Sequence, residues 1–146
     1  MRPSRAIAAI FALALGLAPA AFGQASPPEA SARAMIPALN AHTLALGEEG
    51  YALAAGPITG AFARGRGESV SIRLWAGQDY KIAGVCDEGC SGLVLRLRDP
   101  GGALIAETRG APLQVRPSVT GRHEIEARAA RCTQAQCWFA VNVYAR

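Results

Sequence analysis

From residue 51 onward, apolar residues recur at every second position, and this period constrains the fold more than any other feature of the chain. The alternation is regular in the segments 69–74, 93–98 and 139–144. A period of two places successive side chains on opposite faces of a β-strand, so one face can be buried while the other is solvated. The pattern therefore predicts half-buried strands without intervening helices.

Clusters of turn-forming residues divide this region into short segments. The clusters lie at 65–67, 76–79, 99–102 and 118–121, and each contains glycine. We expect eight strands, at 57–64, 68–75, 80–86, 93–99, 103–109, 113–117, 122–130 and 137–146. Eight short strands at this spacing indicate an all-β domain over residues 51–146, an antiparallel, jelly-roll-like β-sandwich.

Residues 24–50 show a helical period instead and predict an N-terminal amphipathic helix. Its expected buried stripe is Ala32, Met35 or Ile36, Leu39, Thr43 and Leu46. Ser26 is the expected N-cap, with Pro27 at the first helical position and Glu29 completing a capping box. Gly47 is the expected C-terminal cap, and Pro37 is expected to kink or split the helix. The stripe favours a lid over the sheet.

The first 23 residues have the three-part pattern of a secretory signal peptide. Arg2 and Arg5 supply positive charge, residues 6–17 are apolar, and Ala21 and Gly23 fit the positions before a cleavage site. The apolar run is shorter than the roughly 20 residues that cross a bilayer. We expect a cleavable signal, no retained membrane span, and a periplasmic or secreted protein. A buried N-terminal helix is the alternative.

The charge of the mature chain gives no reason to expect a nucleic-acid partner. Without Arg2 and Arg5, 13 basic residues stand against 11 acidic ones, a net charge of +2. Nucleic-acid binding calls for a clustered basic surface. The single Arg-Gly-Arg-Gly run at 64–67 is expected to be a hairpin turn rather than an RNA-binding box.

Four cysteines, Cys86, Cys90, Cys132 and Cys137, predict disulfides in an exported protein. The alternative is a four-thiolate zinc site, for which the spacings C-x3-C and C-x4-C are at the loose end of the usual range. We expect the pairs Cys86–Cys90 and Cys132–Cys137, each closing its own loop, and no metal or other cofactor.

Four further motifs are distinctive: LWAGQDYKIAGVCD at 74–87, LRDPGG at 97–102, PSVTG at 117–121 and a closing Cys-x4-Cys-x-Phe-x-Val. Together they resemble the bacterial pre-peptidase C-terminal domain family, over residues 56–144. The resemblance implies a jelly-roll-like β-sandwich without enzymatic activity, of the kind appended to secreted peptidases, where it aids secretion, localisation or substrate attachment. Many relatives carry an acidic run after the second cysteine. Here that stretch is SGLVL at 91–95, so we expect no calcium site.

Candidate catalytic residues are few. His123 is the sole histidine of the strand region, and it shares the inward face of its strand, where a packing role is expected. Glu124 and Glu126 share the opposite face, and paired carboxylates can hydrolyse glycosides. Flanked by Arg122 and Arg128, they are expected to form a solvated sheet surface instead. We therefore expect no enzyme, with an uncharacterised hydrolase as an alternative.

Three aromatic residues, Trp75, Trp138 and Tyr144, fall on outward positions of their strands. An outer sheet face with such rings can stack on sugars. The alternative is that the N-terminal helix covers them.

Alternate connections of an antiparallel sandwich emerge at the same end. The first, third, fifth and seventh connections would therefore bring both cysteine loops to one end, which also leaves pairing across the loops open. Six charged residues accompany them there: Arg64, Arg66, Asp87, Glu88, Arg109 and Arg131. Stapled polar loops on a rigid scaffold often carry binding sites, so we expect a partner to dock at this end. Protection of the loops from proteases is the alternative. The opposite end, with its short glycine and proline turns, offers less to a ligand.

Taken together, these patterns favour a non-catalytic accessory or binding module of the cell envelope, with a protein or polysaccharide ligand. A structural or stress-related envelope protein without a specific ligand is the alternative.

Overall fold

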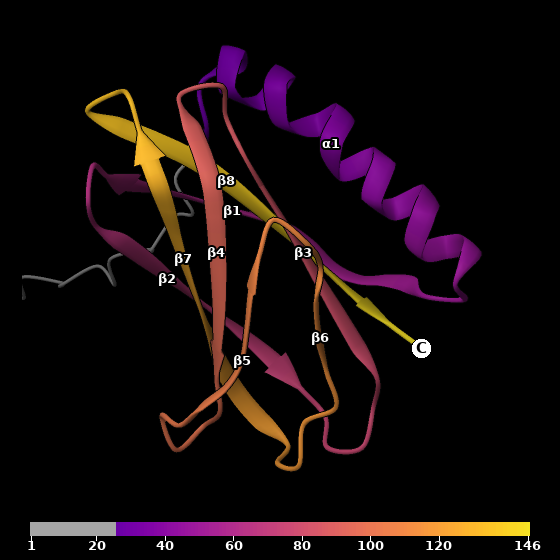
Figure 1. Cartoon of the computed structure of the whole chain (residues 1–146). Helices are drawn as coiled ribbons and strands as arrows, with labels where there is room; N and C mark the ends of the chain where they lie inside the picture. The colour runs from indigo at the N-terminus through magenta and orange to yellow at the C-terminus, as the bar shows by residue number, and fades with distance from the viewer. Residues whose placement is uncertain (1–25) are drawn as a thin grey trace, which may run out of the picture.

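A computed structural model describes residues 26–146 and shows a β-sandwich with one helix packed against it (Figure 1). The predicted signal peptide, residues 1–23, lies outside the described residues. Within residues 26–146, no helix is both long and apolar enough to cross a membrane. The all-β fold with an N-terminal helix is confirmed.

The eight predicted strands are all present, and several extend beyond their predicted bounds. They are β1 (Ala52–Ala63), β2 (Gly67–Leu74), β3 (Tyr80–Cys86), β4 (Cys90–Arg98), β5 (Leu104–Arg109), β6 (Leu113–Val115), β7 (Gly121–Cys132) and β8 (Gln136–Ala145). The largest difference is in β1, which begins at Ala52 rather than at residue 57. Its pairing with β8 shifts register on either side of Ala55, so the simple alternation on which the prediction relied is interrupted there.

The strands form two four-stranded sheets, with the orders β1-β8-β3-β6 and β2-β7-β4-β5. Every pairing is antiparallel, and successive strands mostly alternate between the sheets, which is the predicted jelly-roll arrangement. One expectation was wrong. The turn at 64–67 does not close a hairpin, because β1 pairs with β8 and β2 pairs with β7.

The core lies between the two sheets and is built from the inward positions of the period-two pattern. Its fully or nearly fully buried members include Leu74, Ile82, Leu95, Leu97, Leu113, Ile125, Phe139, Val141 and Val143. Phe62 and Phe139, on the neighbouring strands β1 and β8, stack within the core with ring centroids 5.7 Å apart. Burying this much apolar surface is the main stabilising contribution to the sandwich.

The helix α1 (Glu29–Glu48) begins later than predicted. Pro28 occupies the N-cap position and no side chain caps the helix, so the expected Ser26 capping box is wrong. Glu29 instead forms an ion pair with Arg33, one turn along the helix. Pro37 lies within α1 and does not split it.

The helix ends in a Schellman motif rather than at Gly47. Gly50, with φ of +85°, donates from its N–H to the Gly47 carbonyl, and Tyr51 donates to the Leu46 carbonyl. Leu46 and Tyr51 also pack together in one apolar cluster, the contact that usually accompanies this motif. Gly50 is therefore the glycine that the left-handed backbone requires.

The apolar stripe of α1 covers the outer face of the β1-β8-β3-β6 sheet (Figure 1). Met35, Leu39 and Leu46 are buried, whereas Ile36 is 53% exposed, so Met35 is the member of the stripe at that turn. We call this sheet the covered sheet and the β2-β7-β4-β5 sheet the open sheet. The predicted lid is confirmed.

Candidate functional site

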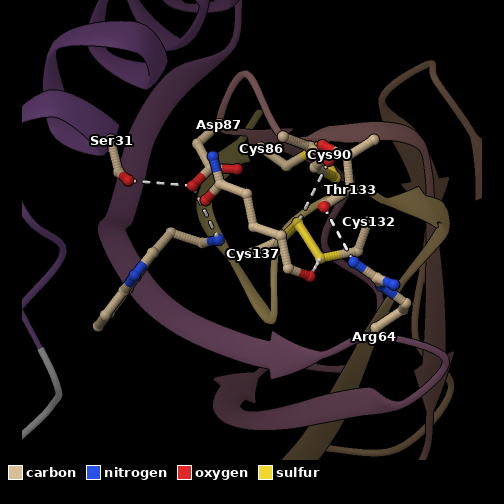
Figure 2. Close-up of a disulfide and its surroundings, with 11 residues drawn as sticks. Ser31, Arg64, Cys86, Asp87, Cys90, Cys132, Thr133 and Cys137 are labelled. Carbon is tan, nitrogen blue, oxygen red and sulfur yellow. Dashed lines mark hydrogen bonds between the residues drawn. A yellow bond between two sulfur atoms is a disulfide. The ribbon is translucent and has the colours of Figure 1, made fainter.

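The two disulfides lie side by side at one end of the sandwich (Figure 2). They join Cys86 to Cys90 and Cys132 to Cys137, as predicted, and no cysteine of the described chain is free. Cys90 and Cys132 are cross-strand partners in β4 and β7, which places both loops at the same level. The predicted position of both cysteine loops at one end, which we call the cysteine end, is confirmed.

Hydrogen bonds connect the loops of the cysteine end. The carbonyl of Gly89 accepts from Thr133 N (2.8 Å) and from Thr133 Oγ1 (3.1 Å). Arg64, in the β1–β2 turn, donates from Nη2 to the Thr133 carbonyl (2.9 Å). Three connections that are distant in sequence thus form one linked surface.

Asp87 is placed at this end but faces inward. Only 4% of it is exposed, and its Oδ2 accepts hydrogen bonds from Ser31 Oγ (3.0 Å) and Trp138 N (3.2 Å) (Figure 2). Its Oδ1 is buried without a hydrogen-bond partner among the described residues. A small cavity of about 70 Å³ lies beside it, lined in part by Glu88 and Gln134. The carboxylate therefore fastens α1 to β8 rather than facing a ligand outside.

The other predicted members of the cysteine end are more scattered. Arg66, Glu88 and Arg131 are exposed at its rim. Arg109 lies further down, because its strand partner is Val94, four residues beyond the first residue of β4. The structure thus brings Arg64 against the cysteine loops and leaves Arg109 on the open sheet.

The three predicted aromatic contacts have three different environments. Tyr144 is fully buried beneath α1, where its hydroxyl lies 2.9 Å from Thr43 Oγ1 and accepts from Asn142 Nδ2 (3.1 Å). Trp138 is half-buried against the cluster around Met35. Trp75 is 53% exposed, just past the end of β2. Tyr144 cannot contact a ligand, so Trp75 is the aromatic residue available to one.

Trp75 is part of the lining of a cleft of about 390 Å³ between the two sheets. Its lining lies away from the cysteines, near the start of β1 and the ends of β2 and β8. Its apolar walls include Ile58, Ile72, Tyr80 and Val143, and its polar groups come from Ser71, Arg73 and Gln78. We call it the Trp75 cleft.

The loop that carries Trp75 is held in place by hydrogen bonds. Trp75 N donates to the Tyr80 hydroxyl (3.2 Å), and Ala76 N donates to Thr120 Oγ1 (2.9 Å). Gly77 N donates to the Pro117 carbonyl (2.9 Å). The guanidinium of Arg73 lies 5.8 Å from the Trp75 ring centroid, within cation–π range. These contacts fix the position of the Trp75 loop beside the cleft.

Sequence reasoning singled out Trp75 but not the cleft beside it. The period of two also placed Ser71 and Arg73 on the outward face of their strand, but the sequence favoured the cysteine end as the binding site. The cleft forms because β1 and β2 belong to different sheets. The hairpin expected at 64–67 would have placed both strands in one sheet.

The residues considered for catalysis all lie on β7. His123 is 1% exposed, and its Nδ1 lies 3.1 Å from the Gly121 carbonyl, while its Nε2 is buried and has no hydrogen-bond partner among residues 26–146. Glu124 accepts a hydrogen bond from Ser69 (2.8 Å), and Glu126 forms ion pairs with Arg98 and Arg128. His123 is thus packed in the sheet, and the two glutamates form surface pairs.

The fold and its paired disulfides define the class of the protein, a disulfide-bearing jelly-roll β-sandwich with a helix over one sheet. The chain matches no known family model, and no curated protein is significantly similar to it. The similarity of its motifs to pre-peptidase C-terminal domains therefore stays a prediction.

Proposed function

We propose that this protein is a non-catalytic, exported binding module of the cell envelope, and that its ligand occupies the Trp75 cleft. The observation that carries the proposal is the cleft itself, whose lining combines apolar side chains, a half-exposed tryptophan and a few polar groups. Small-molecule and polymer sites commonly combine a concave apolar surface with a few placed polar groups.

Export is supported by the two disulfides, which persist in oxidising compartments, and by the signal-like first 23 residues. The motif resemblance to modules appended to secreted peptidases is consistent with an accessory role. The burial of His123 supports the absence of a catalytic base in the strand region.

The alternative, an envelope protein without a specific ligand, has one observation in its favour. The cysteine end is a cross-linked surface whose buried carboxylate, Asp87, accepts hydrogen bonds from Ser31 and Trp138 and so links α1 to β8. Such an end can protect loops from proteolysis without binding anything.

Binding of the mature protein to arrays of polysaccharides and of envelope proteins separates these functions. We expect a Trp75→Ala variant to lose binding by about tenfold or more, because an exposed ring at the centre of a site often dominates its affinity. Leu44→Ala is the matched control, since it removes an apolar side chain that is 74% exposed on α1.

The variant Arg64→Ala/Arg66→Ala/Arg131→Ala tests the cysteine end in the same assay. Full binding by this variant, together with loss in Trp75→Ala, supports the Trp75 cleft. The opposite result moves the site to the cysteine end, and a wild-type protein that binds nothing supports the structural alternative.

A further inference from the structure

The outer face of the open sheet carries ordered rows of charged residues. In residues 26–146, α1 packs on β1, β3 and β8, and no helix covers the open sheet (Figure 1). Directly paired residues of neighbouring strands share a face, so the outward side chains form rows across the sheet. Counted from the cysteine end, the first row contains Arg109 and Arg128, and the second contains Arg96, Glu107 and Glu126. The third row contains Arg98 and Glu124, and the fourth contains Arg73 and Arg122.

Positive charge is concentrated on this face. Six arginines and three glutamates project from it, which leaves a net charge of +3. The described chain has 13 basic and 11 acidic residues, a net charge of +2, so the remaining surface is slightly negative. An anionic partner is therefore attracted to this face rather than to the molecule as a whole.

The glutamates neutralise the middle rows. Arg96 Nε donates to Glu107 Oε2 (2.6 Å), and this hydrogen bond together with the charge of Glu107 raises the pKa of Arg96. Glu126 lies between two arginines, 3.4 Å from Arg128 Nη2 and 4.0 Å from Arg98 Nη2. The middle of the face is thus balanced within the protein.

Uncompensated arginines stand at the two ends of the face. Arg73, Arg109 and Arg122 form no ion pair with the carboxylates of residues 26–146. Arg73 and Arg122 are direct cross-strand partners, an arrangement that like charges disfavour. Because Arg73 also borders the Trp75 ring, this end of the face is continuous with the Trp75 cleft.

Hollows accompany the arginines at both ends. One, of about 230 Å³, is lined by Arg96, Arg109 and Arg128 with a single carboxylate, Glu107. The other, of about 300 Å³, has a balanced lining of Arg98, Arg122, Asp99 and Glu124. Arg122 and Arg128 are six residues apart on β7, a separation of roughly 20 Å along a strand.

We propose that the ligand is a linear acidic polysaccharide that lies along β7 on the outer face of the open sheet. Its carboxylate or sulfate groups bind Arg109 and Arg128 at one end and Arg73 and Arg122 at the other, and one sugar ring stacks on Trp75. This inference rests on the proposed function and names the chemical class of its ligand.

Two features favour a polysaccharide over other polyanions. A membrane surface presents continuous negative charge, which the glutamates of the middle rows would repel, whereas a polymer with spaced acid groups can bridge them. An exposed indole adjoining the arginines suits a sugar ring, which has an apolar face for stacking. Arginine, the basic residue of this face throughout, binds carboxylate and sulfate with two parallel hydrogen bonds.

The test measures binding of the mature protein to immobilised polygalacturonate, with neutral dextran, polyglutamate and phosphatidylglycerol vesicles as comparison probes. We expect binding to polygalacturonate that weakens as salt is raised. Arg109→Gln/Arg122→Gln should bind about tenfold more weakly, because charge-assisted hydrogen bonds are lost at both ends. Arg33→Gln/Arg116→Gln, which removes the same charge away from this face, should bind within about twofold of wild type.

Each other result overturns the inference. If neutral dextran binds as well as polygalacturonate in a Trp75-dependent manner, the proposed function stands and the arginine face is not the site. Equal or tighter binding to polyglutamate or to the vesicles assigns the face to a different partner. No binding to polygalacturonate at low salt rejects the acidic polysaccharide, whatever the neutral glycan and protein arrays show.

Discussion

The hydroxyl groups of Thr43 on α1 and Tyr144 on β8 lie 2.9 Å apart, beneath the helix and away from solvent. Tyr144 also accepts a hydrogen bond from Asn142, so one buried hydroxyl connects the helix to the covered sheet. We expect Tyr144→Phe to lower the free energy of unfolding by about 1–3 kcal/mol, because Asn142 Nδ2 and Thr43 Oγ1 lose this partner.

Urea unfolding measures this effect. Tyr51→Phe is the matched control, since the Tyr51 ring is buried in the same cluster but its hydroxyl forms no hydrogen bond within residues 26–146. Equal losses in the two variants would show that the hydrogen bonds of the Tyr144 hydroxyl make no specific contribution to stability.

Most of the fold could be predicted because apolar and polar residues alternate with a period of two along the strands, and turn residues separate them. The inward residues of β2 and β8 were identified from that period alone, and all eight strands are present. The same reasoning placed Cys90 and Cys132 at one end, since strand direction alternates along an antiparallel chain. The start of β1 was missed, because the register shifts around Ala55 interrupt the period.

The candidate site was harder to predict because outward parity does not determine exposure. Trp75 and Tyr144 both fall on outward positions, yet α1 covers Tyr144 completely and leaves Trp75 exposed. The helix covers one particular sheet because Met35 and Leu39 pack against Val85 and Ala140. No local sequence pattern predicts this tertiary contact. The Trp75 cleft likewise depends on β1 and β2 entering different sheets.

Gly60 and Phe139 provide a test of packing in the core. They are cross-strand partners in β1 and β8, and a Cβ at position 60 would lie 2.6 Å from Phe139 Cζ. We expect Gly60→Ala to destabilise the domain by about 1–3 kcal/mol through overpacking, because the Phe139 ring is fully buried and stacked on Phe62.

Gly47→Ala is the opposite case in the same experiment. A Cβ there has no neighbour within 4 Å, and the residue is inside α1. Alanine should stabilise the helix by about 0.5–1 kcal/mol. Thermal or urea unfolding that ranks Gly60→Ala at or above Gly47→Ala in stability would contradict this account of the core.

The hydrogen bonds of Asp87 should determine how firmly the first turns of α1 are held against β8. Its Oδ2 accepts from Ser31 and Trp138, so Asp87→Ala removes the link between the start of α1 and β8. We expect faster amide hydrogen exchange in residues 29–36 and little change in the strands, because local opening follows the local loss of contacts. Glu88→Ala, at an exposed neighbouring position, should leave exchange unchanged, and similar exchange in both variants would rule out this role for Asp87.

The two disulfides should contribute unequally to stability, although their loops are similarly short. Loops of this length predict an entropic contribution of about 2 kcal/mol each. Cys132 and Cys137 are 7% and 0% exposed and belong to the core, whereas Cys86 and Cys90 are only partly buried beside it. Replacing the Cys132–Cys137 pair by alanines therefore also removes buried sulfur from a packed region.

We expect the Cys132→Ala/Cys137→Ala variant to unfold at a clearly lower urea concentration than Cys86→Ala/Cys90→Ala. Peptide mapping without reduction should show in each variant that the remaining pair is still joined within its own loop. A larger loss of stability on replacing the Cys86–Cys90 pair would contradict the argument that burial makes the Cys132–Cys137 pair the more important one. Because Cys90 and Cys132 are cross-strand partners, each double variant also reports whether one disulfide suffices to hold both loops of the cysteine end together.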